Sequence, residues 1–255
     1  MKQSIRLFVI FLLTASVVTG QTKRKSSPAE KETATTTLSV RLFPVGGQFV
    51  ALPEPEGFVE ATSQSKEVKE HFAATFGPEH EVLAVHLPPE TLEAIGRRMR
   101  VEFDHYTTVT VSTAFKEVDA SVELFNQVVG QIEQSTEQML APNHPLTKEL
   151  IGELEKNLSD RSKKQTKVNI TQPIRFGQVM KTVDVYSQLL LMNISVASAG
   201  ARQGGPMLCG ASIIKVNNKI LLVNTYKNYK SRNDIEFMRE FTRKWAEQIV
   251  KANRQ

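Results

Sequence analysis

The chain has 255 residues, 40% of them hydrophobic, and a formal net charge of +5 at pH 7. A chain of this length can bury enough surface to form its own core, and its single cysteine, Cys209, excludes an internal disulfide. The charge is uneven, because residues 38–160 carry 9 Lys and Arg against 20 Asp and Glu (−11), whereas residues 161–255 carry 17 against 5 (+12). Either the two halves of one fold complement each other, or the second half presents a basic face to an anionic partner.

The first twenty residues have the pattern of an export signal. Lys2 and Arg6 precede an apolar run from Leu7 to Val18, and Gly20 follows closely. The run is shorter than the ~20 apolar residues that a membrane-spanning helix needs. A basic start, a short apolar core and a small-residue end are typical of a cleaved signal. We therefore predict cleavage near Gly20 and an exported mature chain with no membrane span, for which nucleic acid is not an expected partner. An uncleaved N-terminal anchor is the alternative.

Residues 21–37 lack aromatic and large aliphatic side chains, which predicts a disordered linker. Residues 38–255 then predict a single α+β domain. Apolar and β-branched runs predict its first strands, and helical spacing of apolar residues predicts the helices between them. The first half is expected to contain strands at 38–43, 48–52, 81–87 and 105–115, and helices at 63–76, 89–95 and 121–140.

The second half is expected to form most of the sheet. After a helix at 146–158, the pattern predicts strands at 168–177, 180–186, 189–196, 207–216 and 220–226. Pro173 indicates an edge or bulged position. The glycine-rich stretch 200–205 is followed by a strand rather than a helix, so it is interpreted as a strand connection and not as a phosphate loop. Asn217 and Asn218 tolerate positive φ and predict a type I′ hairpin turn.

A long amphipathic helix is predicted to close the chain. Ser231 and Asp234 have the spacing of a capping box. After Asp234 in the sequence, apolar residues recur at helical spacing and define one stripe: Ile235, Met238, Phe241, Trp245, Ile249 and Ala252. This stripe predicts a helix laid across the preceding hairpin, with Trp245 as its largest anchor.

The order of these motifs resembles a set of exported bacterial proteins to which no function is assigned. The resemblance is carried by Leu52-Pro53, by Gly57-Phe58-Val59, by the hairpin Val216 to Ile220, and by Tyr226, Tyr229, Asp234, Met238-Arg239, Thr242 and Trp245. It spans Leu38 to Ala252. More loosely, the order of strands and helices is similar to the Mog1/PsbP-like fold, an antiparallel sheet with helices on its faces. That resemblance implies an accessory or binding module and supplies no catalytic residues.

The residues that carry chemistry form no recognised catalytic or metal-binding set. The five histidines show no i, i+4 pair on a helix, Cys209 lies on an apolar strand, and no nucleophile elbow is present. We predict no cofactor and no metal. Carboxylates at Glu54, Glu56, Glu60, Glu67 and Glu70 leave one enzymatic alternative, a carboxylate-dependent hydrolase of an envelope polymer, which requires two acids about 5–10 Å apart.

The strongest candidate for binding joins the last strand to the last helix. Lys227, Tyr229, Lys230 and Arg232 gather where the free N–H groups of a helix point outward. We therefore predict a non-enzymatic, periplasmic or extracellular binding module of the bacterial cell envelope that contacts an unknown protein or an anionic component. Two alternatives remain open for these residues and this chain. The cations are solvated without a partner, or the protein is purely structural.

Overall fold

The computed structural model describes residues 39–99, 101–139, 148, 151–152, 154–156, 159–160, 165–170, 173–198 and 201–254. The predicted signal 1–20, the predicted linker 21–37 and much of the predicted helix 146–158 lie outside the described residues. Within the described part of the chain, no helix combines the length and the apolar character needed to cross a membrane.

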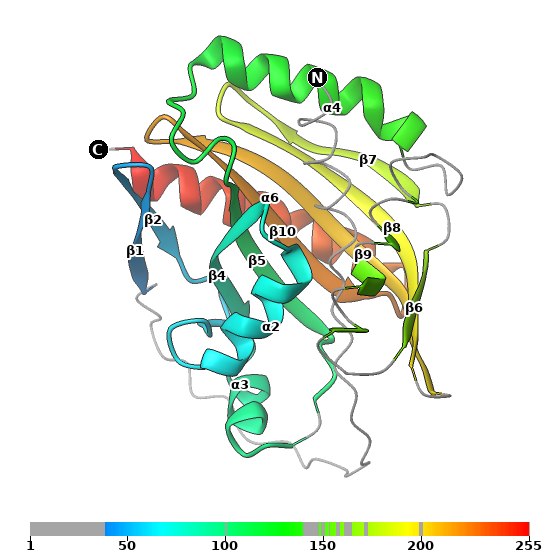
Figure 1. Ribbon diagram of the computed structural model, residues 1–255. Helices are drawn as coiled ribbons and strands as arrows, with labels where there is room; N and C mark the ends of the chain where they lie inside the picture. Colours follow the sequence, from blue (N-terminus) through cyan, green and yellow to red (C-terminus); the bar gives the residue numbers. More distant parts are fainter. Residues whose placement is uncertain are drawn as a thin grey trace.

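An eight-stranded sheet forms the centre of the molecule (Figure 1), and every strand pair described within it is antiparallel. Across the sheet the order is β3 (Val59–Glu60), β4 (His80–Leu87), β5 (His105–Ser112), β10 (Lys219–Asn228), β9 (Ala201–Val216), β8 (Val185–Ser198) and β6 (Thr166–Ile170), with β7 (Ile174–Lys181) also paired to β8. A separate antiparallel hairpin consists of β1 (Val40–Val45) and β2 (Gln48–Pro53).

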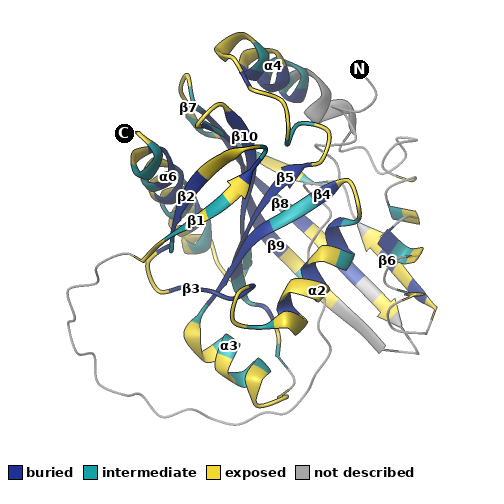
Figure 2. Cartoon of the chain, turned by 60° about the vertical axis from the view of Figure 1, so that its left-hand side comes forward, coloured by how far each residue is buried: buried dark blue, intermediate teal, exposed yellow. Residues whose placement is uncertain are grey.

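Helices cover both faces of this sheet. On one face lie α2 (Lys66–Phe76) and α4 (Val122–Met139), which bury Phe72 and Phe125 in a core that includes Tyr106. On the other face lie α6 (Asn233–Asn253) and the β1–β2 hairpin, whose apolar residues pack around Trp245. The short helix α3 (Pro89–Gly96) follows β4. Figure 2 shows buried residues along the central strands and exposed residues on the outer sides of the helices. The predicted α+β class, a mainly antiparallel sheet with helices on its faces, is confirmed.

The hairpin between β9 and β10 forms as its asparagines predict. Asn217 and Asn218 have φ values of 48° and 58°, and the strands pair from Lys219↔Val216 to Asn228↔Met207. The predicted connection at 200–205 is wrong, because Ala201–Val216 is one strand that pairs with β8 from Ala201 to Ile214. Gly204 adopts φ +112°, and a side chain there would overlap the carbonyl of Ile194. A glycine at position 204 therefore allows β9 to approach β8 closely, and it does not mark a loop.

The closing helix packs by a stripe slightly different from the predicted one. Met238, Trp245 and Ile249 are buried as expected, whereas Thr242 and Ala246 complete the buried side. Trp245 is 1% exposed and its indole N–H donates to the carbonyl of Pro53 at 3.0 Å. The helix is therefore fixed to the sheet and, through Trp245, to the β1–β2 hairpin.

Candidate functional site

The segment Tyr226 to Arg232 connects β10 to α6. Tyr226 is fully buried and stacks on Tyr106, with ring centroids 4.6 Å apart. The backbone N–H of Tyr229 donates to the carbonyl of Pro206 at 2.9 Å, and its side chain packs against the cluster of Leu189, Leu208 and Met238. These contacts hold the backbone on both sides of Lys227, the first of the predicted cations.

Asp234 organises the start of α6. Its Oδ2 accepts the backbone N–H groups of Lys230 at 2.9 Å and Ser231 at 2.7 Å. The Ser231 hydroxyl donates to the same oxygen at 3.4 Å. Only one half of the predicted capping box therefore forms. Burial would raise the pKa of Asp234, but the two backbone hydrogen bonds and Lys227 together lower it, so this carboxylate is charged at neutral pH.

Two of the three predicted cations are neutralised within the chain. Lys227 is 17% exposed and lies 3.6 Å from Asp234 and 3.8 Å from Asp104. The Nζ of Lys230 lies 2.7 Å from Asp104 Oδ1, although the side chain is 65% exposed. Arg232 is exposed and has no ion-pair partner among the described residues. The segment therefore presents one uncompensated cation rather than three.

An aromatic cluster that the sequence did not predict lies beside these cations. Phe237 is 47% exposed and lies under the Lys227 ammonium, which is 5.7 Å from its ring centroid. Its neighbours are Phe241, with centroids 5.9 Å apart, and His105 at 5.5 Å. Phe237 falls outside the buried stripe of α6, and an aromatic residue on the polar side of an amphipathic helix is the signal that would have indicated it.

We name the exposed part of this region the α6 N-terminal surface and define it as Tyr229, Lys230, Arg232 and Phe237. It contains all the predicted binding residues except Lys227, which lies beneath it. Arginine and aromatic side chains are both enriched at energetically important positions in protein–protein interfaces. The charge on this surface is small, since Asp104 and Asp234 balance two of the cations.

A second polar group is buried where β3 meets β4. Glu60 lies opposite His86 in the strand pairing, and each is 1% exposed. Glu60 accepts hydrogen bonds from Thr62 and Ser63, and Arg41 lies 3.3 Å from its Oε2. Burial would raise the pKa of Glu60, but the hydrogen bonds outweigh burial and lower it.

His86 and His105 lie on the neighbouring strands β4 and β5 but are not strand partners. Thr107 lies opposite His86, and the two side chains hydrogen-bond at 2.9 Å, whereas His105 lies opposite Lys227. Burial lowers the pKa of His86 to about 4. Its imidazole is therefore neutral at neutral pH and acts as a packed core group that contacts Trp245 edge-on.

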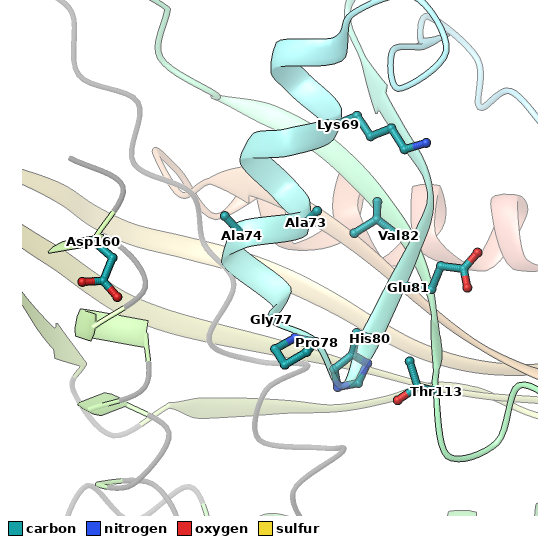
Figure 3. A pocket seen from close by; sticks show the side chains of 10 residues that line it. All are labelled: Lys69, Ala73, Ala74, Gly77, Pro78, His80, Glu81, Val82, Thr113 and Asp160. Carbon is teal, nitrogen blue, oxygen red and sulfur yellow. The ribbon is translucent and has the colours of Figure 1, made fainter. Parts of the chain in front are cut away.

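A pocket of about 760 Å³ lies at the C-terminal end of α2 (Figure 3). Its lining is formed by Lys69, Ala73, Ala74, Gly77, Pro78, His80, Glu81, Val82, Thr113 and Asp160. Both ring nitrogens of His80 are buried without a hydrogen-bond partner among the described residues, and burial lowers its pKa to about 4. The carboxylate of Glu81 is held by Lys116 at 2.6 Å. The pocket therefore combines an apolar wall with a neutral histidine and a carboxylate that is already paired.

Other groups that could carry chemistry include Cys209 and several carboxyl groups. Cys209, which the sequence places on an apolar strand, is fully buried, and burial raises the pKa of its thiol. The described residues contain no group of three or more His, Cys, Asp or Glu side chains that could hold a metal ion. A glycosidic general acid needs a raised pKa, whereas Glu60, Glu123, Asp234 and Glu240 all have lowered pKa values.

No protein-family model matches this chain, and no curated protein matches it in sequence. Solved structures do match it. A mutant of the protein Mog1 shares 11% identity over 85% of this chain and 93% of that chain, with a TM-score of 0.33. The cyanobacterial PsbP of Synechocystis shares 9% identity over 86% and 97%, with a TM-score of 0.36. The Ran-binding protein Mog1p of Saccharomyces cerevisiae shares 12% identity over 85% and 93%, with a TM-score of 0.31. These matches agree with the Mog1/PsbP-like resemblance of the sequence and concern the fold alone.

Proposed function

We propose that this chain is an exported, non-enzymatic binding module of the bacterial cell envelope, which contacts a partner through the α6 N-terminal surface. The observation that supports the proposal is the half-exposed ring of Phe237, which lies under the Lys227 ammonium in the first turns of the helix that the exposed Arg232 precedes. Hydrogen bonds fix the backbone of this segment, from Tyr229 N–H to Pro206 and from the N–H groups of Lys230 and Ser231 to Asp234, so little backbone freedom is lost when a partner binds.

A protein partner is favoured over a bare polyanion. Lys227 and Lys230 already form ion pairs with Asp104 and Asp234, so the net positive charge offered here is small. A polyanion is attracted mainly by uncompensated charge. A protein interface instead uses an aromatic anchor and an arginine surrounded by a polar rim.

The test is quantitative co-purification of tagged chain from fractionated cells. We expect the tagged protein outside the cytoplasm, and we expect Arg232→Glu and Phe237→Ala each to reduce the captured partner at least about tenfold. Lys251→Glu is the matched control, because Lys251 is an exposed cation at the opposite end of the same helix.

The variants also separate the two classes of partner. A protein partner requires that both Arg232→Glu and Phe237→Ala weaken capture. An anionic component requires strong salt dependence and a loss with Arg232→Glu alone. The proposal fails if both variants capture the same partners as the parent, or if the tagged chain stays in the cytoplasm.

A further inference from the structure

The pocket at the C-terminal end of α2 is a groove between this helix and β4, and we name it the α2–β4 groove. Lys69, Ala73 and Gly77 recur every four residues, so they line the groove from one side of α2 and its end. Residues His80 to Val82 line it from β4. Because successive side chains of a strand point to opposite faces of the sheet, three consecutive residues border one pocket along the edge of their strand. Figure 3 shows α2 and β4 next to each other at this pocket, with Asp160 on the other side of α2 from Lys69.

The outer edge of β4 beside the groove has no partner strand in the described part of the chain. β5 pairs with one edge of β4, whereas on the other edge β3 pairs only with His86 and Leu87. A bulge between Val82 and Ala84 interrupts the regular ladder, so the regular unpaired stretch runs from His80 to Val82. The backbone groups of an unpaired edge are a template for a further strand. A strand added here is therefore a short one.

The side chains of the groove add one cation and one imidazole without a partner. Lys69 is exposed and forms no ion pair with the described residues, whereas Lys116 holds the carboxylate of Glu81 at 2.6 Å. His80 is 5% exposed, and neither of its ring nitrogens has a hydrogen-bond partner among the described residues. The χ2 torsion of histidine has a broad range, so a turn of the ring brings a nitrogen to the groove. A peptide group supplies the donor and the acceptor that a neutral imidazole requires.

The dimensions of the groove fit a short extended peptide. Lys69 and Gly77 are eight residues apart, which corresponds to about 12 Å along a helix. A strand rises about 3.3 Å per residue, so about three to four residues span this length. The volume of about 760 Å³ is in the range of ligand sites in proteins. Ala73 and Gly77 are small, which leaves room for the side chains of an added strand.

We propose that the α2–β4 groove binds an extended peptide segment of a partner protein, which adds a short strand to the outer edge of β4 and places an acidic side chain at Lys69. In this mode of recognition, main-chain hydrogen bonds provide affinity and side-chain contacts provide specificity. The site is separate from the α6 N-terminal surface. β5 begins at His105, opposite Lys227, and ends at Ser112, opposite His80, so the two sites lie at opposite ends of this strand.

Titration of the isotope-labelled full chain with synthetic peptides, followed by NMR, tests the proposal. The acidic probe is a capped peptide of sequence Glu-Val-Thr-Val-Thr, and the basic probe has Lys in place of Glu. We expect the acidic probe to bind more tightly and to shift the amide signals of residues 80–82 and of the α2 residues that line the groove. N-methylation of the two valine nitrogens removes two backbone donors and should weaken binding about tenfold.

Two variants with matched controls locate the contact. Lys69→Glu should reverse the preference, so that the basic probe binds about two- to fivefold more tightly than the acidic one. Lys66→Glu is its control, because Lys66 is an exposed cation on the same helix outside the lining of the groove, and the acidic probe should remain preferred. Ala73→Trp fills the groove and should abolish the binding of both probes. Glu70→Trp places the same ring at an exposed position of α2 outside the lining and should leave binding unchanged.

Several results would overturn the proposal. Failure of both probes to shift the signals of the groove removes the site. Binding that survives Ala73→Trp, or that does not respond to N-methylation, removes the added strand. Equal affinity of the two probes for the parent removes Lys69 from the contact. Concentration-dependent dimerisation that Ala73→Trp abolishes would instead assign the groove to a second copy. An Arg232→Glu variant that loses its captured partner but binds the acidic probe normally would leave this proposal intact.

Discussion

At the scale of single residues, the fold depends on buried polar groups with opposite charge preferences. Glu60 is buried as an anion, because hydrogen bonds to its carboxylate offset the cost of burial and lower its pKa. His86, its strand neighbour, is buried as a neutral ring with a pKa of about 4. Glu60 raises and Arg41 lowers the pKa of His86, but burial is the larger cause. The burial of this pair is therefore compatible with a stable fold at neutral pH, whereas acid destabilises the fold.

This difference predicts a loss of stability as the pH falls. An unfolded histidine binds its proton near pH 6.5, whereas folded His86 binds it only near pH 4. Between these values the unfolded state holds more protons, so the free energy of unfolding decreases as the pH decreases. From pH 7 to pH 5 we expect His86 to contribute a loss of about 2 kcal/mol, measured by urea unfolding at both pH values. His80 and His105 act in the same direction.

Two variants separate protonation from packing. His86→Gln should reduce the difference between pH 7 and pH 5, because glutamine does not titrate in this range. Thr107→Val removes the hydrogen bond to His86 and should lower stability by a similar amount at both pH values. An unchanged pH difference in His86→Gln would show that burial of this ring does not control the acid sensitivity.

At the scale of elements, α6 packs closely on the sheet at Gly210, where β9 has no side chain. Gly210 lies below Thr242 of α6 and beside Thr225 of β10, and a methyl group at Gly210 would overlap both hydroxyls. The two threonine hydroxyls hydrogen-bond to each other at 2.7 Å. This close approach lets a polar pair be buried beneath the helix, and it makes the position intolerant of added volume.

Gly210→Ala should therefore lower the free energy of unfolding by about 1–3 kcal/mol through overpacking. Gly205→Ala is the control on the same strand, because no atom lies within 4 Å of the added methyl group. Urea unfolding followed by tryptophan fluorescence measures both. Equal midpoints for the two variants would show that the helix can shift without cost.

Much of this arrangement could be predicted from local patterns. Asn217-Asn218 predicted its turn, and Trp245 predicted the anchor of α6. The helix predicted at 63–76 begins at Lys66, after Ser65, whose side chain accepts the N–H of Val68. The start of β9 could not be predicted, because glycine at 204 and 205 has the same signature in a loop and in a closely paired strand. The alternation within β1 was visible, but its burial depends on which face the hairpin turns to α6.

The candidate site was predicted less well than the fold. Lys227, Lys230 and Arg232 were identified by their proximity in sequence to a helix start. Asp104, which neutralises the two lysines, is more than a hundred residues away in sequence, and only the pairing of β5 with β10 brings it near. Phe237 was not predicted as part of the candidate site, because helical periodicity describes the buried side of a helix and does not identify an exposed aromatic residue as functional.

At the scale of the whole molecule, the charge asymmetry is partly neutralised within the fold. Ion pairs join the acidic first half to the basic second half: Glu133 to Lys181 at 2.8 Å, Asp119 to Lys219 at 2.8 Å, and Asp104 to Lys230 at 2.7 Å. The pairing of β5 with β10 also places the two halves in one sheet. Complementary halves therefore account for part of the charge split that suggested a basic face.

The shared sheet leads to a prediction about cooperativity, on the proposal that residues 38–255 are a single domain. Trp245 reports on the packing of α6 and β2, whereas far-ultraviolet circular dichroism reports on all helices and strands. We expect both signals to give one coincident urea transition, since β10 lies between strands from the two halves and neither half keeps its hydrogen bonds alone. Phe72 lies on the opposite face of the sheet from Trp245. Phe72→Ala should lower the free energy of unfolding by about 3–5 kcal/mol, and the urea midpoints of both signals should fall by the same amount. Two resolved transitions, or a Phe72→Ala shift seen by circular dichroism but not by Trp245, would divide the chain into independent units.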